Sequence, residues 1–339
     1  MLPTRELLGT DVVTSAVGFG CAGLFKIPHR NIRRSVLDAA YDAGIRHFDV
    51  APMYGLGRAE AELSSFLKRH RNDITITTKF GITPTLAGKG VGLLQGPIRA
   101  FLDKRPDMTE TLKIAADGPH SGSFGRLLYS CPGYDKNSAE YSLEKSLRAL
   151  GVDYVDVFLL HDPVGGLRNT SELAEYLDEK RREGRIRAWG ITSRLSQLPV
   201  VIETLRRAEV IQFRDDVFGQ PLNADKIFPT ARITFGALAH ALPALRRFIA
   251  NTPNASEMWS ERLGKDLTAE SSLAKLLLSI ALRRNPSGPV LFTTSKPQRI
   301  RVAAEAALHS TTMPDALVAT FSDLVAAARL ASAEMIRTP

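Results

Sequence analysis

The chain has 339 residues, an ordinary apolar fraction of 44% and a formal net charge of +8 at pH 7. It contains no run of about eighteen apolar residues, and its first residues lack the apolar core of a signal peptide, so no membrane span is expected and a cytoplasmic protein is favoured. Its lysines and arginines are dispersed and do not alternate with aromatic residues along a stripe, so nucleic-acid binding is not expected.

Strand-like and helix-like segments alternate along most of the chain, which predicts a parallel sheet covered by helices. Residues 1–16 are interpreted as a lead-in, with a small hairpin that caps the sheet. Strands are expected at residues 17–20, 45–49, 74–78, 155–161, 188–191, 210–213, 232–235 and 290–293. Helices are expected at residues 31–43, 59–67, 138–149, 171–183, 197–208, 271–285 and 297–308. Eight strands predict an α/β fold of the (β/α)8 TIM-barrel class, with residues 1–339 in a single domain.

Two segments add to this pattern. An insertion at about residues 82–137, after the third strand, is far longer than a normal strand-to-helix connection and is rich in glycine and proline. Because it leaves the C-terminal end of the strand that carries Lys79, it is expected either to form a lid over a ligand pocket or to be a surface excursion. A C-terminal extra helix at residues 315–333 is expected to pack on the barrel exterior.

Four polar residues stand at or just after predicted strand ends. Asp49 ends the second strand, Tyr54 lies in the turn that follows it, Lys79 ends the third strand and His161 ends the fourth. In a parallel barrel these strand ends converge on one face. Each residue taken singly also has an ordinary structural explanation, as a turn cap, a lysine that reaches solvent, a packed tyrosine or a core histidine.

Together and in this order, Asp49, Tyr54, Lys79 and His161 resemble the catalytic tetrad of the aldo-keto reductase superfamily, and the resemblance runs from about residue 17 to about residue 308. It implies an NAD(P)(H)-dependent oxidoreductase that moves a hydride between nicotinamide and a small carbonyl, alcohol or sugar lactol. Tyr54 would be the general acid/base, and Lys79 would favour its phenolate. Asp49 would keep Lys79 charged, and His161 would orient the carbonyl.

Two other functions stay open at this point. The same family includes non-catalytic, nucleotide-binding regulatory subunits, and an unrelated barrel enzyme could use Lys79 as a Schiff base. The tyrosine five residues after Asp49 argues against the second alternative.

The cofactor is expected at the eighth strand and the helix after it. No G-x-G-x-x-G sequence follows a strand, so a Rossmann unit is not indicated. Residues 290–299 resemble the family's phosphate-binding segment, and Ser295, Lys296 and Arg299 at a helix N-terminus suit a phosphate. This favours NADP(H), with NAD(H) possible, although Ser295 could instead cap the helix. Val302 and Ala303 stand where the family often has a Glu-Asn pair at the adenine, which leaves the preference open.

Further residues match family positions at the nicotinamide. Gln212 matches the glutamine that contacts the carboxamide, and Phe235 matches the aromatic residue that stacks on the ring, although it could equally belong to the core. Thr192 and Ser193 match a serine–asparagine pair, with a shorter side chain at Ser193.

The substrate is expected to be a small carbonyl compound or sugar. The residues expected to line its pocket are Phe25, Met53, Asp162 and Arg194, and the sequence looks most like family members that act as sugar or pyridoxal dehydrogenases. Asp162 could bind a substrate hydroxyl or cap a turn. Cys21 and Cys131 are too few for a disulfide framework and are interpreted as free thiols, and no metal site is expected. The sequence indicates no particular oligomeric state.

Overall fold

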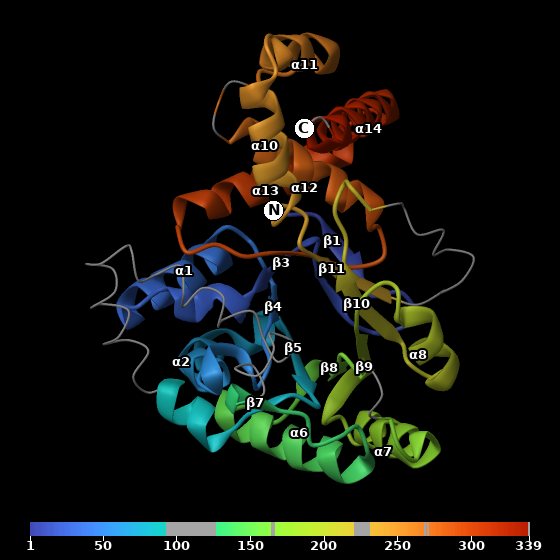
Figure 1. The fold of residues 1–339 in the computed structure, drawn as a ribbon. Helices are drawn as coiled ribbons and strands as arrows, with labels where there is room; N and C mark the ends of the chain where they lie inside the picture. The colour runs from blue at the N-terminus through green and yellow to red at the C-terminus, as the bar shows by residue number, and fades with distance from the viewer. Residues whose placement is uncertain (93–126, 164–166, 220–230, 268, 270, 338–339) are drawn as a thin grey trace.

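The computed structural model describes residues 1–92, 127–163, 167–219, 231–267, 269 and 271–337. Its centre is a closed barrel of parallel strands in the order β10-β11-β12-β3-β4-β5-β8-β9 (Figure 1). The strands are β3 (Val17–Gly20), β4 (His47–Asp49), β5 (Thr75–Phe80), β8 (Val155–His161), β9 (Ile186–Thr192), β10 (Val210–Arg214), β11 (Ala231–Phe235) and β12 (Val290–Phe292). The prediction of an α/β barrel of the TIM class is therefore confirmed.

The strand register brings the C-terminal ends of neighbouring strands to one rim. His161 at the end of β8 pairs with Thr192 at the end of β9, and Thr192 also pairs with Gln212 on β10. On β4 and β5, which continue the barrel next to β8, Asp49 pairs with Thr77, and Lys79 lies two residues farther along the same face of β5. The register thus turns Asp49 and Lys79 toward the same space.

Helices cover the outside of the barrel at nearly the predicted positions. They are α1 (Arg30–Asp42), α2 (Ala59–His70), α6 (Lys136–Leu150), α7 (Thr170–Arg182), α8 (Leu198–Thr204), α12 (Ser272–Arg284) and α13 (Gln298–Thr312). In α6 the sequence explains both ends, because the Asp135 carboxylate accepts a hydrogen bond from the Ser138 backbone N–H and Gly151 adopts the left-handed conformation past the end. Helix α8 is shorter than predicted, since Leu205 leaves the helical conformation.

The N-terminal hairpin closes one end of the barrel. Strands β1 (Thr4–Glu6) and β2 (Val13–Ser15) pair in antiparallel fashion, as expected for the lead-in. Leu7 and Val12 are fully buried and pack against interior residues of the barrel strands, such as Val157 and Val210. The apolar side chains of the hairpin therefore close this end of the barrel.

The insertion after β5 starts and returns as a pair of short antiparallel strands. These are β6 (Thr83–Pro84) and β7 (Tyr129–Ser130). Residues 93–126, which make up most of the insertion, lie outside the described residues.

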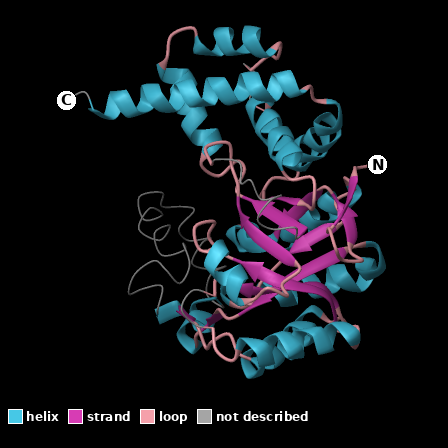
Figure 2. Ribbon diagram, turned by 90° about the vertical axis from the view of Figure 1, so that its right-hand side faces the viewer, coloured by secondary structure: helices cyan, strands magenta, loops and turns pink. Residues whose placement is uncertain are grey.

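A separate layer of helices follows β11. It consists of α10 (Ala241–Asn251), α11 (Ala255–Leu263) and the C-terminal α14 (Asp315–Arg337), which lie beside α12 (Figures 1 and 2). The last helix was expected to pack on the barrel exterior, but its main partners are α10 and α11. Phe321 of α14 packs edge-on against Trp259 of α11, with 6.0 Å between ring centroids, in an apolar cluster to which α10 and α12 also contribute.

Helix α12 joins this layer to the barrel. Leu278 and Leu282 belong to the main core, whereas Leu276 and Ile280 belong to the apolar cluster of the layer. One helix contributing to both clusters supports the proposal of a single domain over the chain. Within the described residues, no helix is both long and apolar enough to cross a membrane.

Candidate active site

A buried ion pair stands where β4 and β5 end. The Lys79 ammonium donates hydrogen bonds to Asp49 Oδ1 at 2.6 Å, to the Val50 carbonyl at 3.2 Å and to the Tyr54 hydroxyl at 3.4 Å. Lys79 is only 1% exposed and Asp49 only 3%. Because an isolated ammonium is costly to bury, this arrangement holds a lysine at the bottom of the site that could not stand there alone. Structural explanations for Asp49 as a turn cap and Lys79 as a solvent-reaching side chain are thereby excluded.

Gln212 completes the partners of Asp49 from the opposite side of the barrel. Its side-chain amide donates to Asp49 Oδ2 at 2.7 Å, and its side chain is buried. Gln212 was expected to contact the nicotinamide carboxamide. Its side-chain nitrogen is bound to Asp49, and its contact with the cofactor stays a prediction. The two residues are 163 positions apart, so no local spacing in the sequence pointed to this pair.

Tyr54 lies on a short 3-10 turn, η2 (Tyr54–Leu56), directly after β4. Gly55 has a φ of 59°, and a Cβ atom there would lie 2.4 Å from the Phe25 ring. The ring of Phe25 therefore packs directly on this turn, and the guanidinium of Arg33 lies 4.7 Å from its centroid. Phe25, expected to line the substrate pocket, is buried beside Tyr54 and supports its turn.

The pKa values of Tyr54 and Lys79 are both raised above their usual values. Burial raises the pKa of Tyr54, and the nearby Lys79 ammonium only partly opposes this effect. Burial by itself would lower the pKa of Lys79, but attraction to Asp49 and to Tyr54 outweighs it, so the pKa of Lys79 lies above its usual value. Lys79 thus favours the phenolate as expected, but desolvation of the phenolate is the larger effect, so the pKa of Tyr54 stays above its usual value. At neutral pH the pair is a phenol and an ammonium.

His161 stands next to Tyr54 and its backbone is held by the return of the insertion. The two rings meet edge-on at a centroid distance of 6.1 Å. The Tyr134 hydroxyl donates to the carbonyl of His161 and, at 3.1 Å, to that of Asp162. Asp162 has a φ of 55°, and its carboxylate accepts a hydrogen bond from the Ser193 hydroxyl at 3.0 Å. Ser193 and Asp162, predicted to contact cofactor and substrate, thus bind each other.

A cavity of about 550 Å³ opens beside His161 at the rim formed by β8, β9, β10 and β11. It is lined by His161, Asp162, Thr192, Ser193, Arg194, Leu195, Arg214, Asp215, Asp216, Gly219 and Phe235. The structure therefore brings the predicted cofactor residues Thr192, Ser193 and Phe235 together with the predicted substrate residues Asp162 and Arg194. Gln212, Phe25 and Met53 are not among the lining residues.

The predicted phosphate residues stand at the start of α13. Ser295, Lys296 and Arg299 are exposed there. No side chain caps this helix, so Ser295 is not its N-cap. The turn is instead held by Thr294, whose hydroxyl accepts a hydrogen bond from the Lys296 backbone N–H at 3.1 Å. The three side chains are thus available to a ligand.

Met53 contacts the described ends of the insertion. It forms a small apolar cluster with Ala51 and Ile82, against which Tyr54 and Tyr129 pack. The insertion therefore begins and returns beside the Tyr54 turn. The prediction that it forms a lid concerns mainly residues 93–126, which lie outside the described residues, and stays a prediction.

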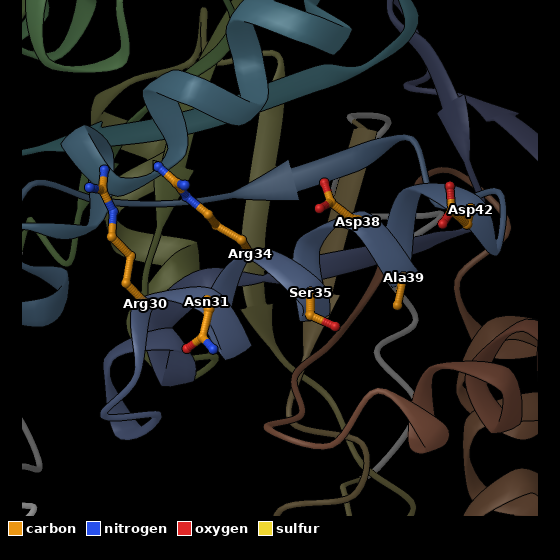
Figure 3. Close-up of a pocket in the computed structure, with 7 residues that line it drawn as sticks. All are labelled: Arg30, Asn31, Arg34, Ser35, Asp38, Ala39 and Asp42. Carbon is orange, nitrogen blue, oxygen red and sulfur yellow. The ribbon is translucent and has the colours of Figure 1, made fainter.

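A second hollow, of about 470 Å³, lies on the outer surface of α1 (Figure 3). Its lining residues are Arg30, Asn31, Arg34, Ser35, Asp38, Ala39 and Asp42, all on this helix. None of them comes from a strand end, so this hollow is not connected with the buried ion pair. In the described part of the chain, no group of three or more His, Cys, Asp or Glu side chains could hold a metal ion, and Cys21 and Cys131 are free thiols.

Comparisons with known proteins agree with this geometry. A family model described as the aldo/keto reductase family matches residues 16–213. A D-threo-aldose 1-dehydrogenase from a Pseudomonas species is 30% identical over 193 residues, which are 53% of this chain and 50% of the relative. A pyridoxal 4-dehydrogenase from Microbacterium luteolum is 29% identical over 187 residues, 54% of this chain and 50% of the relative. The chain thus spans about half the length of the curated relatives it matches.

Solved structures share the fold over nearly the whole chain. A glycerol dehydrogenase from Gluconobacter oxydans superposes with a TM-score of 0.67 at 19% identity, covering 95% of both chains. The holo form of an aldo-keto reductase from Bacillus halodurans gives a TM-score of 0.65 at 20% identity, covering 96% of both chains.

Proposed function

The chain belongs to the aldo/keto reductase family, and from this premise we propose that it is an NAD(P)(H)-dependent oxidoreductase that transfers a hydride between nicotinamide and a small carbonyl or alcohol. One observation carries the proposal. A continuous set of hydrogen bonds runs from Gln212 through Asp49 and Lys79 to the hydroxyl of Tyr54, beside a histidine that lines a cavity. A phenol with a charged lysine behind it can donate a proton to a carbonyl oxygen, which supports Tyr54 as the general acid.

The residues present would fit a nicotinamide dinucleotide. The cavity volume of about 550 Å³ lies within the usual range for small-molecule sites. The hydroxyl of Thr192 and the ring of Phe235 suit an aromatic ring that carries an amide, while Lys296 and Arg299 suit a phosphate. When bound, the cofactor would supply or accept the hydride.

The protein's own residues would then move the proton. In the reduction direction, the Tyr54 O–H bond breaks, its proton passes to the carbonyl oxygen, and the Lys79 ammonium stabilises the phenolate that remains. Asp49 keeps Lys79 charged, and His161 donates a hydrogen bond that orients the carbonyl. In the oxidation direction, the phenolate of Tyr54 accepts the hydroxyl proton of the alcohol or lactol.

We favour sugar lactols and related aldehydes as substrates. The support is that the two relatives named above are dehydrogenases of an aldose and of pyridoxal. The Schiff-base alternative is disfavoured, because a Schiff base forms from the neutral amine and the raised pKa of Lys79 keeps it an ammonium. The non-catalytic alternative has no observation in its favour.

Replacing Tyr54 tests the proposal. We expect Tyr54→Phe to bind NADPH within a few-fold of wild type, measured by quenching of NADPH fluorescence, and to lower kcat by about 10²–10⁴-fold, since the phenylalanine ring has no proton to give. Tyr141→Phe, on the exposed outer face of α6, is the matched control and should keep kcat. A folded Tyr54→Phe variant with wild-type kcat would refute the catalytic role.

Lys296 tests the cofactor preference. We propose that NADP(H) is favoured over NAD(H), with charge-assisted contacts from Ser295, Lys296 and Arg299 to the 2′-phosphate. Lys296→Ala should therefore weaken NADPH about tenfold and leave NADH nearly unchanged. Lys68→Ala, an exposed lysine on α2, is the control. Equal weakening of both cofactors would show that Lys296 does not contact this phosphate.

A further inference from the structure

Two arginines line the cavity without a carboxylate partner among the described residues. Arg194 follows β9, Arg214 ends β10, and both side chains are exposed. By contrast, Arg284 is paired with Asp215 at 2.8 Å, and Arg187 on β9 is paired with Asp156 at 2.8 Å. The cavity beside His161 therefore has cationic groups that the fold itself does not use for an ion pair.

The carboxylates that share this cavity are occupied by other groups. Asp215 pairs with Arg284, as just described. Asp216 accepts hydrogen bonds from the backbone N–H groups of Phe218 at 2.9 Å and Gly219 at 3.2 Å. Asp162 accepts from Ser193. The two guanidinium groups thus remain open to an anion that enters the cavity.

The side chain of Arg214 is held in place on two sides. Its Nη1 atom lies 3.1 Å and 3.0 Å from the two ring nitrogens of His240. Gly236 has a φ of 88°, and a Cβ atom there would lie 3.1 Å from both Cγ and Nε of Arg214. The bare backbone of Gly236 therefore makes room for the arginine stem. A guanidinium held in this way loses less conformational freedom on binding than one on an unsupported side chain.

We infer that Arg214, assisted by Arg194, binds an anionic group of the substrate, so that the substrate class is an acidic carbonyl compound or lactol carrying a carboxylate or a phosphate. The planar fork of a guanidinium matches either group with two parallel hydrogen bonds. This inference rests on the proposed function and assigns a substrate class to the same site. The sequence patterns did not single out Arg214, because an arginine at the end of a strand is ordinary by itself.

The test compares neutral and anionic substrates of the same shape. Reduction of benzaldehyde and 4-carboxybenzaldehyde with NADPH tests the carboxylate, and oxidation of glucose and glucose 6-phosphate tests the phosphate. We expect wild type to favour the anionic member of at least one pair by tenfold or more in kcat/KM. In Arg214→Ala this advantage should disappear through a higher KM for the anionic member, so that the ratio of kcat/KM between the two members approaches one. Arg214→Lys should keep part of the advantage, since it retains the charge without the fork.

Controls separate this inference from its rivals. Arg206→Ala, at an exposed arginine in the turn after α8, should change neither pair. Equal losses for neutral and anionic substrates in Arg214→Ala would overturn the inference, as would a wild type that prefers neither anion. A selective loss of NADPH binding would also overturn it, by assigning Arg214 to the cofactor. In all three cases, turnover of benzaldehyde that depends on Tyr54 would leave the proposed function standing, whereas no turnover of any carbonyl would remove both.

Discussion

At the scale of single residues, the carboxylate of Asp49 has a hydrogen-bond partner on each oxygen, and these partners determine the charge and position of Lys79 beside Tyr54. Lys79 occupies one oxygen and Gln212 the other. A buried carboxylate that lost either partner would be costly, and its effect on the lysine would change. The raised pKa of Tyr54 depends on the same network, since the charge of Lys79 is what limits the rise.

Removing the amide of Gln212 should therefore disturb both stability and proton transfer. In Gln212→Leu, Asp49 Oδ2 is left buried without a donor, which should cost about 1–3 kcal/mol of unfolding free energy. We also expect kcat to fall about tenfold or more and the pH at which alcohol oxidation rises to shift, because oxidation needs the Tyr54 phenolate. The measurements are urea unfolding and a pH profile of kcat. Asn251→Leu, at the exposed end of α10, is the control. If Gln212→Leu is less stable but has the pH profile of wild type, then Gln212 stabilises the fold and does not affect proton transfer.

At the scale of elements, the end of β5 and the return of the insertion depend on each other. Gly81 follows β5 with a φ of 105°, and a Cβ atom there would lie 1.9 Å from the Tyr134 ring. Tyr134 in turn donates to the carbonyls of His161 and Asp162. A glycine in one loop thus allows a tyrosine from another segment to hold the strand end that carries His161.

Gly81 and Gly184 both have a positive φ, so comparing alanine variants at the two positions distinguishes the contact with Tyr134 from the effect of backbone strain. Gly184 has a φ of 74° and open space around its Cβ position. Gly184→Ala should cost about 1 kcal/mol of unfolding free energy, from strain only. Gly81→Ala should cost several kcal/mol and also lower kcat, because Tyr134 must move and release the His161 backbone.

Chemical denaturation and steady-state kinetics of both variants would check this prediction. A third variant, Tyr134→Phe, keeps the ring and removes the hydrogen bonds, so it should lower kcat with little effect on packing. Equal destabilisation of Gly81→Ala and Gly184→Ala would contradict the proposed contact.

At the scale of the whole molecule, the closed end of the barrel contains a polar layer among apolar residues. His47 is fully buried between Thr75 and Thr77, with distances of 2.9 Å and 3.2 Å to their hydroxyls. Burial, and secondarily the charge of Lys79, lowers the pKa of His47 from 6.5 to about 3. The imidazole is therefore neutral in the folded barrel.

This pKa makes the whole fold sensitive to acid. Below pH 6.5 the unfolded chain takes up a proton at His47 that the folded protein does not bind until about pH 3, so the free energy of unfolding decreases as the pH is lowered through this window. Between pH 6.5 and pH 5 the loss from this group is up to about 2 kcal/mol. Urea unfolding at pH 7 and pH 5 should show a smaller decrease in His47→Gln than in wild type, and His29→Gln, an exposed histidine, should behave as wild type. Identical decreases in all three proteins would contradict the prediction.

Local patterns in the sequence determined the barrel and the rim on which Asp49, Lys79 and His161 stand. Alternation of strands and helices is set by residues a few positions apart, and the parallel arrangement then places every strand end on one face. The placement of Tyr54 just past a strand end was accessible for the same reason, since a proline and a glycine mark its turn.

Only the tertiary structure decided which side chains meet at that rim. The pairing of Gln212 with Asp49, the hydrogen bonds from Tyr134 to the His161 strand end and the packing of Phe25 on Gly55 all join segments that are distant along the chain. The partner of the last helix was decided in the same way, by the packing of Phe321 on Trp259. Such contacts follow from shape and from the satisfaction of buried polar groups across the barrel, and neither leaves a periodic signal in the sequence.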